Sequence, residues 1–213
     1  MALEGVIYDL DGTLVDSKDD LADSVNEMLS RLSLPRLDPT VIHGFIGEGA
    51  ERLIRRSLGP AHQHLYARAA PVWREEYGQR LLAKTRLYEG IAEVLRAPPP
   101  LRAVLTNKPG AFAREILRGL GVGEAFRAVL GGDEAPRKPA PGGLLTLCET
   151  LGIPPSRALL VGDSSVDLET GRAAGIPVCA VTWGLGKHAA LAGADHLCST
   201  PAELGELLGR LRS

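Results

Sequence analysis

The sequence predicts an α/β protein: a Rossmann-like parallel sheet with helices on both faces, plus an inserted all-helical cap domain. Short apolar segments alternate with helical patterns along most of the chain, as in parallel sheets. Polar residues directly follow several of these segments. Residues 16–83 show only helical patterns, directly after the first strand. We therefore expect a core of residues 1–15 and 84–213 and a cap of residues 16–83.

The first predicted strand, residues 3–8, is mostly apolar and too short for a helix. Asp9 and Asp11 follow it, and Gly12 then allows the chain to turn. Residues two apart in an extended chain point to the same side, so the two carboxylates should lie close together. Such a pair needs a cation, a shared proton or much water, and we favour a cation. Oxygen-only ligands favour a hard ion, magnesium above all.

The segment 16–83 contains several predicted helices. Ser17 with Asp20 three residues on predicts an N-cap and its partner, and the apolar residues that follow keep helical spacing until Pro35. Two more helices are expected over 39–45 and 50–58. The pattern over 61–82 is helical again, and Pro71 should break or kink it.

From residue 84 onward, helices and strands alternate. The predicted strands cover 101–105, 128–130, 158–161 and 178–182, with a last short strand at Leu197. The predicted helices cover 90–97, 110–120, 141–151, 164–174 and 202–212, and Pro98-Pro99-Pro100 is expected to be only a tight connection. Ligands bind at the carboxyl ends of parallel strands. Thr106, Asn107 and Asp163 directly follow such strands, and Lys138 follows another by a short loop.

Composition narrows the classes of function. The 213 residues are 45% hydrophobic and 23% charged, with a formal net charge of −2, so no basic field attracts nucleic acid. No signal peptide, polybasic tail or membrane span is evident, and we expect a cytoplasmic monomer or homodimer. The three cysteines fit no zinc pattern, and we expect buried thiols in a reducing compartment.

The residues gathered at the strand ends suit phosphoryl transfer. A hard cation and a lysine can neutralise a phosphate that carboxylates would otherwise repel. An aspartate can then attack phosphorus and form an aspartyl-phosphate.

Four motifs in order resemble the signature of the haloacid dehalogenase-like hydrolase superfamily. They are Asp9-Leu10-Asp11-Gly12-Thr13-Leu14, Thr106-Asn107-Lys108, Lys138-Pro139, and Gly162-Asp163-Ser164 with Asp167. The helical insertion after the first motif resembles the cap of the phosphoglycolate phosphatase-like branch. The resemblance extends over essentially the whole chain.

This resemblance implies a role for each motif residue. Asp9 would be the nucleophile, and Asp11 would protonate the leaving alcohol and later deprotonate the attacking water. The carboxylates of Asp9 and Asp163, with the main-chain carbonyl of Asp11, would bind Mg²⁺. The phosphoryl oxygens would be held by Thr106, the amide of Asn107 and Lys138.

Three further residues keep two interpretations each. Asp167 fits either a shell around the metal or a capping box with Ser164. Glu48 and Arg52 flank Gly49 in the cap and could face the substrate or form a solvated surface.

The resemblance implies a magnesium-dependent phosphatase acting on a small phosphorylated metabolite, with phosphoglycolate as the first choice. A phosphosugar mutase and a pyrophosphatase of the same superfamily stay open. From other classes, we keep a receiver-like signalling module and a non-catalytic scaffold. A receiver would carry its acid pair and phospho-acceptor on different strands and would lack so large a helical insertion.

Overall fold

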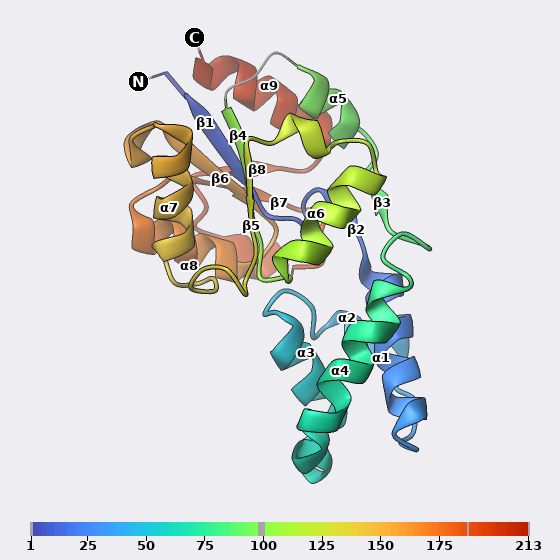
Figure 1. Ribbon diagram of the computed structural model, residues 1–213. Coiled ribbons are helices and arrows are strands. Elements are labelled where there is room, and N and C mark those ends of the chain that lie inside the picture. Colours follow the sequence, from blue (N-terminus) through green and yellow to red (C-terminus); the bar gives the residue numbers. More distant parts are fainter. Residues whose placement is uncertain (1, 98–100, 187, 213) are drawn as a thin grey trace.

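A parallel sheet forms the centre of the molecule. The computed structural model describes residues 2–97, 101–186 and 188–212, so Pro98-Pro99-Pro100 lies outside the described residues. Within them, six parallel strands follow the order β5-β4-β1-β6-β7-β8 (Figure 1). Their bounds are β1 Gly5–Tyr8, β4 Leu101–Leu105, β5 Ala128–Leu130, β6 Ala158–Gly162, β7 Val178–Val181 and β8 His196–Cys198. The predicted α/β fold with a parallel sheet is confirmed, including the short last strand around Leu197.

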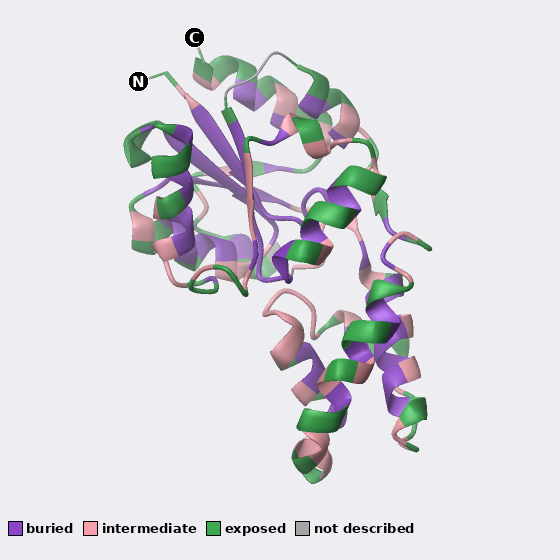
Figure 2. Ribbon diagram, viewed as in Figure 1, coloured by how far each residue is buried: buried purple, intermediate pink, exposed green. Residues whose placement is uncertain are grey.

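Helices cover both faces of the sheet because successive strand residues point to opposite sides. On β1, Val6 and Tyr8 belong to the apolar cluster that contains residues of α5, α6 and α9. Ile7, between them, belongs to the cluster with α7 and α8. The helices span α5 Ile91–Arg96, α6 Gly110–Gly119, α7 Gly142–Leu151, α8 Ser165–Ala174 and α9 Pro201–Arg212. Figure 2 shows the central strands buried, β5 at one edge of the sheet half-buried, and the outer surfaces of the helices exposed.

Four further helices lie beyond the carboxyl ends of the strands (Figure 1). They are α1 Lys18–Arg31, α2 Pro39–His43, α3 Ala50–Leu58 and α4 Tyr66–Gly78, with a 3₁₀ turn at Pro60–Leu65 before α4. Two short antiparallel strands, β2 Val15–Asp16 and β3 Arg86–Leu87, pair where the chain leaves the sheet region and returns to it. Strands of two residues are too short for an alternating pattern, so the sequence did not predict them.

The start of α1 differs from the prediction. Ser17 precedes the helix, but its side chain makes no capping hydrogen bond, and its hydroxyl donates to Asp11. Asp20 is fully buried and accepts hydrogen bonds from the amides of Lys84 and Thr85 and from the Thr85 hydroxyl. The predicted capping pair was therefore wrong, because both side chains bind tertiary partners that local spacing does not show.

The prediction for Pro71 was also wrong in part. The helical pattern over 61–82 divides at Leu65, where the 3₁₀ turn ends, while α4 runs through Pro71. Proline removes one intrahelical hydrogen bond, which local packing can offset. Trp73 and Tyr77, just after the proline, are buried with stacked rings 5.2 Å apart, and they form part of the apolar core of this segment.

The three cysteines, Cys148, Cys179 and Cys198, are free and buried, as predicted. Among the described residues, no helix is both long and apolar enough to span a bilayer.

Candidate active site

A buried cluster of charges lies just beyond the end of β1. The Lys138 ammonium is 2.9 Å from Asp9 Oδ1 and 2.6 Å from Asp167 Oδ1. All three side chains are at most 9% exposed. Asp9 Oδ1 also accepts the amide of Leu10 at 2.7 Å. The structure thus brings together the first, third and fourth motifs of the sequence.

Asp163 completes the cluster from the end of β6. Its carboxylate accepts hydrogen bonds from the amides of Leu185 and Gly186 at 2.8 and 3.0 Å and from the Thr13 hydroxyl at 3.2 Å. Carboxylate oxygens of Asp9, Asp163 and Asp167 all lie within 4.8 Å of one another. Among these described groups, three acids share one ammonium, so two negative charges are in excess when all are ionised.

The turn after β1 depends on Gly12. Its φ is +88°, which side chains with a Cβ rarely adopt, and a Cβ there would overlap the Asp163 carboxylate. Glycine therefore allows the β1 turn to approach Asp163 closely enough to place Asp9 beside it.

Burial shifts the protonation of these acids in the absence of a cation. Desolvation raises the pKa of Asp9 to about 8, although Lys138 opposes this by favouring the ionised form. Desolvation and Asp167 likewise raise the pKa of Asp163 to about 6. For Lys138, burial disfavours the charged form, but Asp167 and Asp9 outweigh it and hold its pKa above the ordinary value. The ammonium therefore stays charged, and the acids around it lack a second positive charge.

Asp167 forms the predicted capping box, and its role in a shell around a metal stays a prediction. Its Oδ2 accepts from the Ser164 amide at 3.2 Å and hydroxyl at 2.7 Å, which is a capping arrangement at the start of α8. Its Oδ1 lies against Lys138 and within reach of a cation shared with Asp9 and Asp163. The two oxygens of one carboxylate thus have different partners.

Asp11 lies at the edge of the cluster and has partners of its own. Its Oδ1 accepts from the Ser17 hydroxyl at 2.5 Å and from the Lys108 ammonium at 2.7 Å. Lys108 also donates to the hydroxyl of Tyr77, which α4 supplies. Burial raises the pKa of Tyr77 to about 12, so this phenol keeps its proton and can accept from the ammonium through its oxygen.

The second motif approaches from the end of β4. Thr106 is buried, and its Oγ1 accepts the amide of Lys108 at 3.2 Å. The Asn107 side chain donates to the carbonyls of Gly47 and Lys138, both at 3.1 Å. Asn107 thus joins the loop before α3 to the loop that carries Lys138. Gly49, with a φ of +91°, passes so close to the Asn107 carbonyl that a Cβ there would be only 3.1 Å away.

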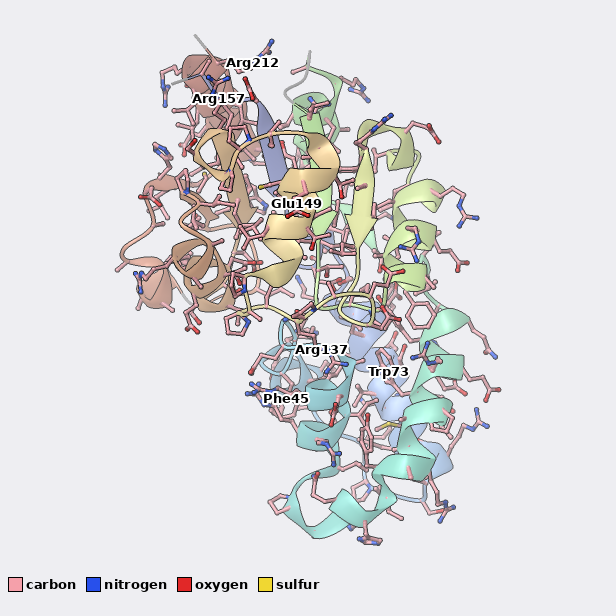
Figure 3. All side chains as sticks on the ribbon, turned by 60° about the vertical axis from the view of Figure 1, so that its left-hand side comes forward. Phe45, Trp73, Arg137, Glu149, Arg157 and Arg212 are labelled. Carbon is pink, nitrogen blue, oxygen red and sulfur yellow. The ribbon has the colours of Figure 1, made fainter. Side chains whose placement is uncertain are left out.

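A pocket of about 30 Å³ lies between these motifs and helices α1, α3 and α4. Its lining residues are Asp9, Asp11, Leu21, Ile46, Gly47, Gly49, Ala50, Leu53, Trp73, Thr106, Asn107, Lys108 and Pro109. Figure 3 shows Arg137 and Trp73 near the junction between the sheet region and the four helices. Arg137 reaches across this junction to Glu51, 3.5 Å away.

Comparisons with known proteins agree with this geometry. A model of the family described as haloacid dehalogenase-like hydrolase matches residues 6–181. The chain belongs to the haloacid dehalogenase-like hydrolases. The class expected from the motifs, a hydrolase, is thereby confirmed. The match includes all four motifs and the helical insertion.

Several relatives within this hydrolase family share the name phosphoglycolate phosphatase. A phosphoglycolate phosphatase of Nitrosospira multiformis is 39% identical over 193 residues, which are 86% of this chain and 85% of the relative. One of Chromobacterium violaceum is 36% identical over 97% of this chain and 96% of the relative. The crystal structure of a predicted phosphoglycolate phosphatase from Haemophilus somnus 129pt superimposes with a TM-score of 0.90 at 30% identity, over 96% of this chain and 97% of that one.

The motif resemblance did not identify Lys108 as a site residue. Lys108 was part of the second motif in the sequence, but no role followed from its position. The one available signal was the scarcity of lysine: only five occur in the chain, two of them in motifs. Its contact with Asp11 depends on two loops that are 97 residues apart.

Two predicted candidates lie outside the pocket lining. Glu48 forms ion pairs with Arg52 and Arg56 on the surface of the helical segment, and the Arg52 side chain is 63% exposed. Their neighbours Gly47, Gly49 and Leu53 line the pocket instead. Contact of Glu48 or Arg52 with a substrate stays a prediction.

Proposed function

We propose that this hydrolase is a Mg²⁺-dependent phosphatase that cleaves a small phosphomonoester, with phosphoglycolate as the first candidate. The observation that carries the proposal is the Lys138 ammonium held against the buried Asp9 carboxylate beside two more acids. A carboxylate can attack an anionic phosphate only when positive charge masks their repulsion. The names of the relatives support the substrate.

The residues present fit a bound magnesium ion. Asp9 and Asp163 supply hard oxygen ligands, with Asp167 beside them, and these acids carry more negative charge than Lys138 neutralises. Burial, with the neighbouring acids as a smaller cause, raises the pKa values of Asp9 and Asp163 in the absence of a cation. When bound, Mg²⁺ would supply the charge that screens the acids and polarises a phosphoryl oxygen. The family resemblance adds the main-chain carbonyl of Asp11 to the ligands.

The chain's own residues divide the reaction between them. The Asp9 carboxylate attacks phosphorus, forming an O–P bond as the bond to the leaving alcohol breaks. Asp11 gives a proton to that alcohol and then takes one from the water that cleaves the aspartyl-phosphate. Lys138, Thr106 and the amide of Asn107 hold the phosphoryl oxygens. Phosphate and the alcohol leave, and both carboxyl groups return to their starting state.

We assign residues 16–83 as a cap domain and residues 1–15 with 84–213 as the catalytic core. Helices α1, α3 and α4 contribute Leu21, Leu53 and Trp73 to the pocket wall, and the loop before α3 adds Ile46, so this segment shields the reaction from bulk water. Asn107 holds the cap loop through the Gly47 carbonyl in this arrangement.

The test is turnover of a chromogenic phosphomonoester with Mg²⁺ or a chelator, in the wild type and in Asp9→Asn. We expect metal-dependent turnover by the wild type alone. A panel containing phosphoglycolate, hexose phosphates and pyrophosphate then ranks the substrates. Preferred cleavage of pyrophosphate, or phosphoryl exchange between hexose phosphates, would favour the pyrophosphatase or mutase alternatives. An absence of turnover would favour a non-catalytic or signalling role.

A further inference from the structure

The pocket contains a cation that the proposed chemistry at phosphorus does not use. Among the described residues that line it, Lys108 is the only one with a positive charge. Lys108 is 5% exposed. Lys138, in contrast, is held by Asp9 and Asp167 at the phosphate end.

Hydrogen bonds fix the position of Lys108 beside the proposed phosphate-binding residue Thr106. Its amide donates to the Thr106 hydroxyl, so the ammonium and the phosphate-binding threonine belong to one short turn after β4. Asp11 accepts from the ammonium at 2.7 Å, and the Tyr77 hydroxyl accepts a second bond. An ammonium has three N–H donors, so these two partners leave one donor for a ligand in the pocket.

The cap determines where this ammonium points. Lys108 Nζ lies 4.6 Å from the centre of the Tyr77 ring, which stacks on Trp73 at an angle of 18°. Tyr77 is fully buried, and Trp73 lines the pocket. The aromatic pair therefore fixes the ammonium from the cap side while its backbone belongs to the core.

We propose that Lys108 binds a carboxylate on the leaving group of the substrate, and that Tyr77 positions its ammonium for this contact. The inference rests on the proposed phosphatase function and deepens it, because it names the residues that would recognise the carboxylate of a substrate such as phosphoglycolate. A phosphate held by Lys138 and Thr106 directs the other end of a short molecule toward the turn that carries Lys108. The remaining N–H of the ammonium then pairs with the substrate carboxylate.

The rest of the pocket is poorly suited to a sugar. Leu21, Ile46 and Leu53 form apolar walls. Among the described lining residues, two buried side-chain atoms have no partner, the acceptor Asn107 Oδ1 and the donor Trp73 Nε1. A polyol with more hydroxyls than these two atoms can serve would bury the others without partners, and each would cost free energy.

The alternative role for Lys108 is to hold Asp11 in place without touching the substrate. The two roles differ in a measurable way. A residue that only positions Asp11 affects every phosphomonoester alike. A residue that binds a carboxylate affects only ligands that carry one.

Binding of two matched phosphonates, measured by calorimetry with Mg²⁺, separates the roles without turnover. One probe is 3-phosphonopropionate, which replaces the bridging oxygen of phosphoglycolate with a methylene, and the other is propylphosphonate, which lacks the carboxylate. We expect the wild type to bind the carboxylate-bearing probe about tenfold to a hundredfold more tightly, as for a charge-assisted hydrogen bond. In Lys108→Met, this ratio should fall to about one.

Tyr77→Phe keeps the ring and removes the hydroxyl, so it serves as a second variant if Lys108→Met does not fold. We expect it to lower the ratio of the two affinities several-fold by loosening the ammonium, and Lys108→Arg to retain a ratio above one. A wild-type ratio near one would overturn the carboxylate assignment while leaving the phosphatase proposal intact, and so would a ratio that Lys108→Met leaves unchanged. If the wild type bound neither phosphonate and showed no metal-dependent phosphatase activity, both proposals would fall.

Discussion

The two ends of the pocket are built in opposite ways. At the phosphate end, the Lys138 ammonium lies within hydrogen-bond reach of Asp9 and Asp167, and carboxylate oxygens of Asp9, Asp163 and Asp167 lie within 4.8 Å of one another. At the leaving-group end, apolar side chains from α1, α3 and α4 face Asp11 and Lys108. The first end belongs entirely to the sheet region, and the second needs both regions.

In the proposed function, the reaction and the selection of the leaving group therefore depend on separate parts of the chain. Electrostatic stabilisation needs rigid groups at fixed distances, which the ends of parallel strands provide. Selection of a leaving group needs a wall that can differ between relatives without disturbing those groups. A helical insertion after the first motif supplies such a wall, because it begins and ends near the same edge of the sheet.

The largest effect should follow from Asp9→Asn at the phosphate end. The amide cannot attack phosphorus, so we expect turnover to fall by roughly 10⁴-fold or more. Steady-state assays with Mg²⁺ measure this, with Asp16→Asn as a control, because Asp16 is a partly exposed acid paired with Lys18. A loss of less than tenfold in Asp9→Asn would contradict the assignment of the nucleophile.

The connection between the two regions can be broken at Asp20. Its buried carboxylate accepts the amides of Lys84 and Thr85, where the chain returns from the helices. Asp20→Ala leaves these donors without partners, and we expect a loss of about 3 kcal/mol in the free energy of unfolding. Urea denaturation measures it. Asp19→Ala, one residue earlier and half-exposed, should change stability by less than about 1 kcal/mol, and equal losses would contradict a specific role for Asp20.

The excess negative charge at the phosphate end predicts that the stability of the folded protein depends on pH and on Mg²⁺. Burial raises the pKa values of Asp9 and Asp163 from 3.8 to about 8 and about 6. Above pH 3.8, and up to about pH 8 for Asp9 and about pH 6 for Asp163, the metal-free folded state holds protons that the unfolded state has lost. The free energy of unfolding of the metal-free protein therefore falls as pH rises through these ranges. Mg²⁺ requires the ionised acids, so its stabilising effect should increase with pH.

Thermal unfolding with Mg²⁺ or a chelator tests this dependence. We expect the increase in Tm caused by Mg²⁺ to be larger at about pH 8 than at about pH 6, with a free energy of about 2.7 kcal/mol when the ion is at a hundredfold its Kd. Asp163→Asn should reduce the increase at both pH values. An increase that is equal at both pH values in the wild type would show that the acids do not lose protons on binding.

The phosphate end was more predictable from the sequence than the leaving-group end. Asp9, Thr106 and Asp163 follow apolar segments directly, and parallel strands bring such positions to one edge. The sheet and most of its helices were therefore predictable from local patterns and chain order. Tertiary partners were not: Ser17 and Asp20 fit a capping pair by spacing, and only the fold shows that they bind Asp11 and the returning chain.

Lys108 shows why the leaving-group end resisted prediction. Its ammonium donates to the hydroxyl of Tyr77, which lies 31 residues earlier on α4. The Tyr77 ring in turn stacks on Trp73. The sequence predicted a helical pattern over 61–82, but it did not indicate that a lysine from the sheet region would contact Tyr77 there. Pairs of this kind depend on how two regions meet, which periodicity within either region does not encode.

The smallest expected effects are on KM, and they should differ between substitutions of two neighbouring residues on α3. Leu53 is buried and lines the pocket, whereas Arg52 points to the surface and pairs with Glu48. We expect Leu53→Ala to raise the KM for the preferred substrate several-fold through lost apolar contact, with a smaller change in kcat, because the groups at the phosphate end stay in place. Steady-state kinetics on both variants measure the difference.

Arg52→Ala should change KM by less than about twofold, because an exposed ion pair contributes little. Circular dichroism of both variants checks that α3 is retained. If Arg52→Ala instead raised KM more than Leu53→Ala, the substrate would contact the charged surface of the cap, as the sequence alone allowed for Glu48 and Arg52. Residues outside the pocket lining would then help to select the substrate, and the leaving-group end would include the surface of α3 around Arg52.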